Sequence, residues 1–355
     1  MNTQHVSNAK MIENTFCWVD IAKFFFSICI VLLHTSAIDF IGEVPSFYVT
    51  RIVFRMAVPF FFVCSGFFLA TKIWDNRENM KGAIRKYVIR LGIWILVFES
   101  INLFLEVIEY IYKGTFDFEA IIEIIKHVLF YPYGALWYLQ ASLIGVILLY
   151  PFLKRKKETV ALICGIILYV WALICNNYYF VVENTSINVV VEGYMDIFIS
   201  ARNGLFVGFI FLLIGIITYP FYKYAKEKIN MTYHAMALII CVILYCFEIY
   251  CLFDKSYLDD GALYIMQLLL IPVLLTWLLR LKCEIDISKS LKLRNLSTGI
   301  YLLHRPIIMI IKGGAKILNI NLPNLLLALF VIFFSITICL WSYKFKNKTI
   351  SNFLK

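Results

Sequence analysis

The chain has 355 residues, of which 62% are hydrophobic and only 16% are charged. Soluble globular proteins carry about 45–50% apolar and about 25% charged residues, so the composition excludes an ordinary soluble domain and indicates a polytopic membrane protein. The net charge of +10 lies mainly in alternate loops between apolar runs. This distribution is typical of membrane topology and argues against nucleic acid as a partner.

Apolar runs long enough to cross about 30 Å of hydrocarbon predict ten transmembrane helices. We expect an all-α, polytopic bundle that forms a single transmembrane domain over residues 1–355, since no repeat or linker marks a second domain. No cleavable signal precedes the first run, so the first helix is expected to be retained. The expected helices cover about residues 18–40, 50–70, 88–111, 133–153, 160–180, 204–219, 233–253, 261–279, 296–311 and 322–343.

The distribution of Lys and Arg between the loops sets the expected orientation. One set of alternate loops, together with the C-terminal tail, carries 21 Lys and Arg residues, whereas the opposite set carries 6. The positive-inside rule places the basic set in the cytoplasm. We therefore expect both termini to be cytoplasmic and the protein to be a multi-pass component of the cell (cytoplasmic) membrane.

The ten cysteines form neither a C-x-x-C pair nor a His/Cys pattern with metal-ligand spacing. Most of them lie in or beside apolar runs, where a free thiol behaves as a small hydrophobic group. We therefore expect no zinc, no other metal site and no structural disulfide.

The first apolar run, from Phe16 to Phe40, carries ionisable side chains that hydrocarbon disfavours. Lys23 and His34 are eleven positions apart, which at about 100° per residue returns them to nearly the same helix face. Asp20 and Lys23 lie near the start of the run, where snorkelling to the interface would also explain them. His34 lies deeper in the run, and histidine is the residue type whose ordinary pKa is nearest neutrality. We therefore interpret His34 as a functional residue, with helix packing as the alternative.

Further polar and aromatic residues are expected to line a vestibule on the outer side of the membrane. Arg55 precedes Pro59, which removes a backbone hydrogen bond within the second run, and a short loop brings Arg55 close to His34. Glu99 should pair with a cation or accept a proton. Trp137 and Tyr138 would equally suit the belt of aromatic residues found at a membrane–water interface. The set comprises Arg55, Glu99, Trp137, Tyr138, Arg202, Asn203 and His304.

Basic residues cluster where the third expected helix begins on the cytoplasmic side. Arg85, Lys86 and Arg90 occupy about one and a half helical turns. Such a cluster can simply fix the topology. It also suits a multiply phosphorylated ligand, because each phosphate would gain charge-assisted hydrogen bonds. Binding of such an anionic ligand is therefore the alternative to a purely topological role for these three residues.

Several motifs, taken in order, resemble acyltransferase family 3, the integral-membrane O-acyltransferases of bacterial cell envelopes. The resemblance covers residues 18–343 and implies a site built on the first helix. It also implies a donor site at the start of the third helix. The motifs are Asp20, Lys23 and His34 in the first run, PFFFVCSGFFL in the second, the basic start of the third, LWYL at Leu136–Leu139 and GIYLLHRPI at Gly299–Ile307.

Two departures from the family pattern concern cations. The usual Arg of the first-helix motif is replaced by Lys23 here. Lysine keeps the positive charge but lacks the planar guanidinium group with its paired hydrogen-bond donors. The R-x-x-R motif of the third helix reads Tyr87 to Arg90, so Arg90 alone carries over. The chain also resembles the membrane half of the vancomycin-resistance serine racemases, in FRMAVPFFFVCSG and ARNG. Those proteins continue into a racemase domain, and racemase chemistry is not expected of this chain, which ends at Lys355.

The resemblance implies an acyl-CoA-dependent O-acetyltransferase without a permanently bound cofactor. Its donor would be acetyl-CoA or another acyl-CoA, and its acceptor a hydroxyl of an envelope glycan or lipid-linked sugar. His34 would act as the general base beside Asp20, while Lys23 and Arg90 would help to hold the donor. In the alternative reading, the same polar groups bind a serine-like amino acid for transport. The paired broken helices that would favour a transporter are not seen in the sequence.

Overall fold

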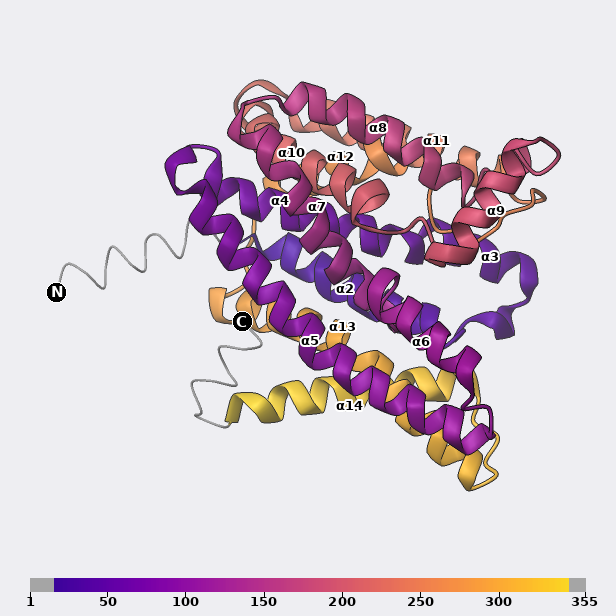
Figure 1. Ribbon diagram of the computed structural model, residues 1–355. Coiled ribbons are helices and arrows are strands. Elements are labelled where there is room, and N and C mark those ends of the chain that lie inside the picture. Colours follow the sequence, from indigo (N-terminus) through magenta and orange to yellow (C-terminus); the bar gives the residue numbers. More distant parts are fainter. Residues whose placement is uncertain (1–15, 345–355) are drawn as a thin grey trace. The chain divides into compact units, whose positions relative to one another are not determined.

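The computed structural model describes residues 16–344, which form helices and no strands (Figure 1). Short 3₁₀ turns connect several of them, and a π-helix at Gly204–Gly208 leads into α10. The helices are α2 (Cys17–His34), α3 (Glu43–Ile52), α4 (Ala57–Ile73), α5 (Met80–Lys113), α6 (Phe118–Phe130), α7 (Trp137–Lys154), α8 (Glu158–Ile174), α9 (Ile187–Phe198), α10 (Phe209–Lys228), α11 (Met231–Cys251), α12 (Gln267–Arg280), α13 (Ile287–Ile317) and α14 (Asn324–Lys344).

Seven helical segments of the described chain are long and apolar enough to cross a membrane. Two further expected spans correspond to the shorter apolar helices α8 and α12, and the remaining one lies within α13. The all-helical prediction is confirmed, and the count of ten spans stays a prediction. The seven segments are Cys17–His34, Glu43–Ile73, Arg77–Lys113, Phe118–Lys154, Gly204–Lys228, Met231–Cys251 and Asn324–Ser342.

The chain divides into two compact units. The first contains the described parts of residues 1–43 and 275–355, and the second contains residues 44–274. The boundary falls inside α12. The first unit therefore joins the N-terminal helix to the C-terminal helices, whereas the second unit is continuous in sequence.

In the first unit, α2 packs along α13 and α14, and α13 packs along α14. Buried aliphatic side chains fill the space between these helices. Gly299 allows the close approach of α13 to α14, because a Cβ atom at this position would collide with the Cys339 Sγ atom. The buried core comprises Val31, Ile300, Ile307, Ile308, Leu327 and Val331.

In the second unit, α10 packs against α4, α7 and α8, and α5 packs against α7. The contact between α4 and α10 depends on small residues. A Cβ atom at Gly66 would meet the Leu212 carbonyl, and one at Gly215 would meet the Val63 carbonyl. Close backbone approach through small residues is a usual way for helices to associate in membranes.

Large apolar side chains remain exposed along whole helices. On α11, for example, Ile239, Ile240, Ile243 and Phe247 are all more than half exposed. A contiguous apolar surface of this kind would aggregate in water, whereas lipid covers it in a membrane. Together with the seven apolar segments, this surface identifies a multi-pass membrane protein.

Candidate active site

In the first unit, the start of α2 is fixed to α13 by a buried carboxylate. Asp20 is 0% exposed. Its side chain accepts hydrogen bonds from Ser290 Oγ at 2.7 Å and from Arg294 Nε and Nη2 at 2.8 and 3.0 Å. Snorkelling therefore does not explain Asp20, because its charge is balanced inside the protein. Its partners lie about 270 positions away in the sequence, and nothing local in the sequence indicated them.

One turn further along α2, Lys23 lies on the same helix pair. Its backbone carbonyl accepts a hydrogen bond from Ser297 Oγ of α13 at 2.8 Å. Its side chain is half-buried. Asp20 and Lys23 thus both belong to the seam between α2 and α13.

At the other end of α2, two of the sequence-predicted histidines meet. The imidazole ring centres of His34 and His304 are 5.2 Å apart, with the ring planes at 31°. His34 is half-buried, whereas His304 is only 1% exposed. His304 Nδ1 lies 2.7 Å from the Tyr301 carbonyl oxygen, one turn earlier in α13. We call His34 and His304 the histidine pair.

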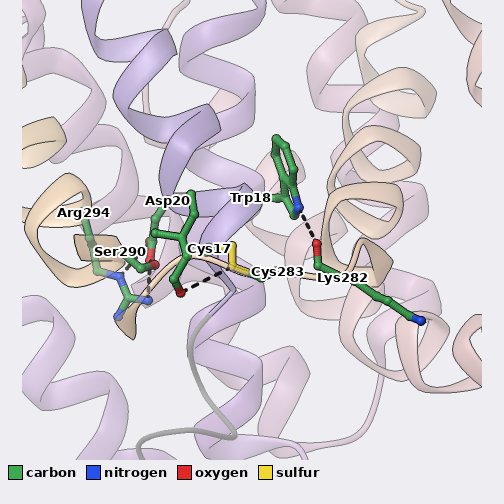
Figure 2. Close-up of a disulfide and its surroundings, with 8 residues drawn as sticks. Cys17, Trp18, Asp20, Lys282, Cys283, Ser290 and Arg294 are labelled. Atoms are coloured by element: carbon green, nitrogen blue, oxygen red, sulfur yellow. Dashed lines mark hydrogen bonds and ion pairs between the residues drawn. A yellow bond between two sulfur atoms is a disulfide. The ribbon is translucent and has the colours of Figure 1, made fainter. Parts of the chain in front are cut away.

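A disulfide joins the ends of the same two segments, which corrects the sequence-based expectation that none is formed. Cys17, the first residue of α2, is bonded to Cys283 before α13, with the Cα atoms 6.1 Å apart. Beside it, Trp18 Nε1 donates to the Lys282 carbonyl at 2.8 Å, and Asp20 lies one turn further along α2 (Figure 2). The expectation failed because thiols 266 positions apart show no sequence pattern.

In the second unit, Arg202 is the centre of a buried charged group. Its Nε and Nη2 donate to the two oxygens of Asp259, both at 3.1 Å, and its Nη1 donates to Asp260 Oδ2 at 2.6 Å. The guanidinium carbon also lies 5.3 Å from the ring centres of both Tyr131 and Trp137. Planar contacts of this kind suit Arg rather than Lys.

Two more arginines complete this group. Arg55 donates through Nη1 to Asp260 Oδ2 and through Nη2 to the Asp260 carbonyl, both at 2.7 Å. Arg51 Nη1 donates to the same carbonyl at 2.6 Å and to the Gly261 carbonyl. We call Arg51, Arg55, Arg202, Asp259 and Asp260 the arginine–aspartate group.

Attraction between opposite charges sets the ionisation of Asp260 and Arg202. Burial by itself would raise the pKa of Asp260, but the guanidinium groups of Arg202 and Arg55 outweigh it and hold that pKa well below its usual range. Burial would likewise lower the pKa of Arg202, and Asp260, Tyr131 and Asp259 together raise it instead. The charged forms of Asp260 and Arg202 are therefore favoured. The group contains three arginines and two aspartates.

Arg55, Arg202 and Trp137 were expected from the sequence as polar or aromatic lining residues, whereas neither aspartate was. Asp259 and Asp260 precede Gly261, which has a positive φ of 66°. The signal was present, because two adjacent carboxylates and a turn glycine stand directly before an apolar run. His34 belongs to the first unit and Arg55 to the second, so their expected proximity stays a prediction.

Asn203 and Tyr138 are held by hydrogen bonds of their own. Asn203 Oδ1 caps the π-helix by accepting from the backbone N–H groups of Leu205 and Phe206, at 3.0 and 3.2 Å. The Tyr138 hydroxyl is 2.8 Å from Ser65 Oγ and donates to the Phe61 carbonyl at 3.2 Å. Both residues organise the helices around them.

Glu99, which was expected to pair with a cation or to accept a proton, has a backbone partner. Its Oε1 accepts from the Tyr133 N–H at 3.2 Å, and Asn102 Nδ2 donates to the Tyr133 carbonyl at 3.4 Å. Among the described residues no Lys, Arg or His forms an ion pair with Glu99. The His127 ring stacks on the Tyr133 ring at 4.4 Å. Glu99 and Asn102 thus fix the chain between α6 and α7.

Three of the basic residues of α5 form an exposed strip. Arg85, Lys86 and Arg90 are all exposed. The Arg90 guanidinium lies over the rings of Tyr87 and Trp94, at 5.9 and 5.4 Å from their centres. The rings orient Arg90 while leaving it accessible. We call Arg85, Lys86 and Arg90 the basic strip.

Comparison with known proteins agrees with these motifs. The family model of the acyltransferase domain of acyltransferase family 3 matches residues 17–344. An amino-acid racemase of Enterococcus faecalis is 33% identical over 57% of this chain and 28% of its own length. A serine/alanine racemase of Enterococcus gallinarum is 25% identical over 84% of this chain and 42% of its own length.

The chain spans less than half the length of the curated relatives that it matches. No solved structure matches. The family match, in contrast, covers nearly the whole described chain, including the histidine pair, the basic strip and the arginine–aspartate group. The chain therefore belongs to acyltransferase family 3, and its described part is all-helical with the apolar helices of a multi-pass membrane protein.

Proposed function

We propose that the protein is an O-acyltransferase of the cell membrane that moves an acetyl or similar acyl group from cytoplasmic acyl-CoA to a hydroxyl of a cell-envelope sugar or glycan. The observation that carries this proposal is the histidine pair within a chain of this family. The proposal includes a bundle of ten spans with cytoplasmic termini, since the loop charges favour that orientation. Glycans and lipid-linked sugars are both acceptors of the proposed class.

In the proposed reaction, His34 takes the proton from the acceptor hydroxyl as its oxygen attacks the thioester carbonyl. The new C–O ester bond forms and the C–S bond breaks. The CoA thiolate leaves and takes up a proton, so that the products are an ester and free CoA. Asp20 and Lys23 support this site from the same helix, and the buried Asp20–Arg294 ion pair fixes α2 on α13.

The basic strip is proposed to bind the phosphates of acyl-CoA. Its cations are exposed, and a phosphorylated ligand offers each of them a charge-assisted hydrogen bond. The arginine–aspartate group, with Tyr131 and Trp137 on its Arg202 member, is proposed to recognise the acceptor. Its excess of cations favours an acceptor that carries an anionic group.

The first test uses purified protein in lipid nanodiscs with radiolabelled acetyl-CoA. Wild-type protein should cleave the thioester, and His34→Ala should lower the turnover at least about 100-fold, because a general base contributes about 10² to 10⁴ in rate. The matched control is His234→Ala, which removes another buried imidazole, one that contacts the Val273 carbonyl in the other unit. The control should keep near-normal turnover per folded molecule.

A packing role for His34 would give a different result. Loss of packing lowers thermal stability and yield before it lowers the activity of folded protein. If folded His34→Ala with bound acyl-CoA turns over normally, His34 is not the base.

The second candidate function is transport of a serine-like amino acid. It is favoured by the similarity to a serine/alanine racemase over 84% of the chain. The same preparation distinguishes the two functions. Binding of labelled serine, without thioester cleavage and without any effect of acetyl-CoA, would support the transporter and exclude the acyltransferase.

A further inference from the structure

The hydrogen bond of His304 determines which of its ring nitrogens carries the proton. His304 Nδ1 is 2.7 Å from the Tyr301 carbonyl oxygen. A carbonyl oxygen can only accept, so Nδ1 must be the donor. In the neutral ring, Nε2 is consequently the unprotonated nitrogen and presents a lone pair. The hydrogen bond to the backbone carbonyl thus fixes the tautomer. In functional histidines the bond made by one ring nitrogen commonly determines the protonation of the other.

That lone pair is buried and unsatisfied. His304 is 1% exposed, and its Nε2 has no hydrogen-bond partner among the described residues. An unpaired buried acceptor costs about 1–3 kcal/mol, whereas an apolar side chain would fill the same space without that cost. Packing between α13 and its neighbours therefore does not explain an imidazole at this position.

The imidazole of His34 lies next to the His304 ring. The two ring centres are 5.2 Å apart. A single bridging water or a small rotation of the half-buried His34 ring can connect a nitrogen of one ring to a nitrogen of the other at this distance between the ring centres. His34 and His304 come from different helices, and the α2–α13 seam holds them together through Asp20–Arg294 and Ser297–Lys23.

We propose that His304 is the positioning and proton-storing partner of His34 in a two-histidine relay. This inference rests on the proposed acyl transfer. As the acceptor oxygen attacks the thioester, one nitrogen of His34 takes the hydroxyl proton and the other gives its own proton to His304 Nε2. His304 then carries protons on both nitrogens. The proton returns through His34 to the departing CoA thiolate, which leaves both rings neutral and CoA protonated.

Two variants of His304 separate its chemical role from its structural one. His304→Asn places an amide N–H where Nδ1 lies, so it keeps the bond to the Tyr301 carbonyl and deletes Nε2. His304→Ala deletes both. If His304 acts through Nε2, the Asn variant should lower kcat at least about tenfold while the KM for acetyl-CoA and the thermal midpoint stay near wild type. His234→Asn is the matched control and should leave kcat unchanged.

A double variant then tests whether the two histidines act as a unit. Residues of one relay are strongly non-additive, because either loss disables the whole. His34→Ala with His304→Asn should therefore turn over no more slowly than His34→Ala alone. A merely structural His304 would instead multiply the two losses.

Each outcome has a defined meaning. Wild-type kcat in His304→Asn, or multiplied losses in the double variant, would overturn the relay while leaving the acyltransferase with His34 as its sole base. Absence of thioester cleavage by the wild-type protein would overturn the proposed function and the relay together. A tenfold loss in the Asn variant with no further loss in the double variant supports the relay.

Discussion

At the scale of single residues, Arg202 shows how a buried charge becomes acceptable. All three of its donor positions point at carboxylate oxygens, and two aromatic rings cover its carbon. The sequence predicted a polar role for Arg202 because a guanidinium beside an apolar run needs partners. It could not identify Asp259 and Asp260, which lie 57 and 58 positions away and meet Arg202 only after the intervening helices have packed.

Replacing Arg202 should destabilise the second unit. Arg202→Ala leaves Asp259, which is mostly buried, without its main counter-charge, and breaking such a pair costs roughly 3 kcal/mol. Arg202→Lys keeps the charge but loses the planar guanidinium that bonds both carboxylates, so its loss of stability should be intermediate. The measurement is the thermal midpoint of the protein in nanodiscs. Lys226→Ala, at an exposed position near the end of α10, is the control and should not change the midpoint. An unchanged midpoint in Arg202→Ala would show that the group does not stabilise the fold.

At the scale of helices, the start of α2 was predicted from sequence, but the helix ends at His34 and not at residue 40 as expected. The positions of its ionisable residues follow from local spacing, and a functional role of His34 stays a prediction. The partner of α2 did not follow, because α13 lies more than 250 positions away and its contacts depend on long-range packing. The same distinction applies to His304, which was expected to be functional but whose proximity to His34 has no signal in the spacing of either helix.

The basic strip of α5 carries a prediction about the donor. Replacing Arg85, Lys86 and Arg90 together by Ala should weaken acetyl-CoA binding at least about tenfold, which corresponds to about 1.4 kcal/mol, because charge-assisted contacts to phosphate are lost. Acceptor binding should change little. Binding is measured by titration with acetyl-CoA of the correctly inserted protein.

The control for this experiment is an equally basic segment. Lys154 is the last residue of α7, and Arg155 and Lys157 follow it. All three are exposed and are expected on the same side of the membrane. Their replacement by Ala removes the same charge without touching α5 and should leave donor affinity unchanged. If both triple variants weaken acetyl-CoA binding equally, the effect comes from general electrostatics. If the Arg85, Lys86 and Arg90 variant does not weaken binding, the basic strip serves only to set the topology.

At the scale of the whole molecule, the sequence determined the fold class but left the number of spans open. Seven segments satisfy length and apolarity together. The others are short or, like α13, carry several charges in one long helix. Counting apolar residues identifies a transmembrane helix where lipid surrounds the helix. The method is less reliable where neighbouring helices shield a helix from lipid and the helix carries polar groups.

Orientation is the prediction that all the other roles depend on. A reporter fused after Lys157 should be cytoplasmic, and one inserted between Lys255 and Ser256, both exposed, should be external, since the loop charges divide 21 to 6. The insertion lies before Asp259 and Asp260 and interrupts none of the residues of the arginine–aspartate group. The reverse result for either reporter would invert the assignment of donor and acceptor sides.

Two exposed cysteines test the same orientation without any fusion. Cys251, a free thiol at the end of α11, should lie outside and react with a membrane-impermeant maleimide on intact cells. Cys283, which is bonded to Cys17, should lie inside, so that after reduction a permeant maleimide labels it on intact cells and the impermeant one does not. Peptide mass spectrometry quantifies the labelling of both sites in one sample. Labelling of Cys283 by the impermeant maleimide after reduction, together with an unlabelled Cys251, would contradict the cytoplasmic orientation of the termini.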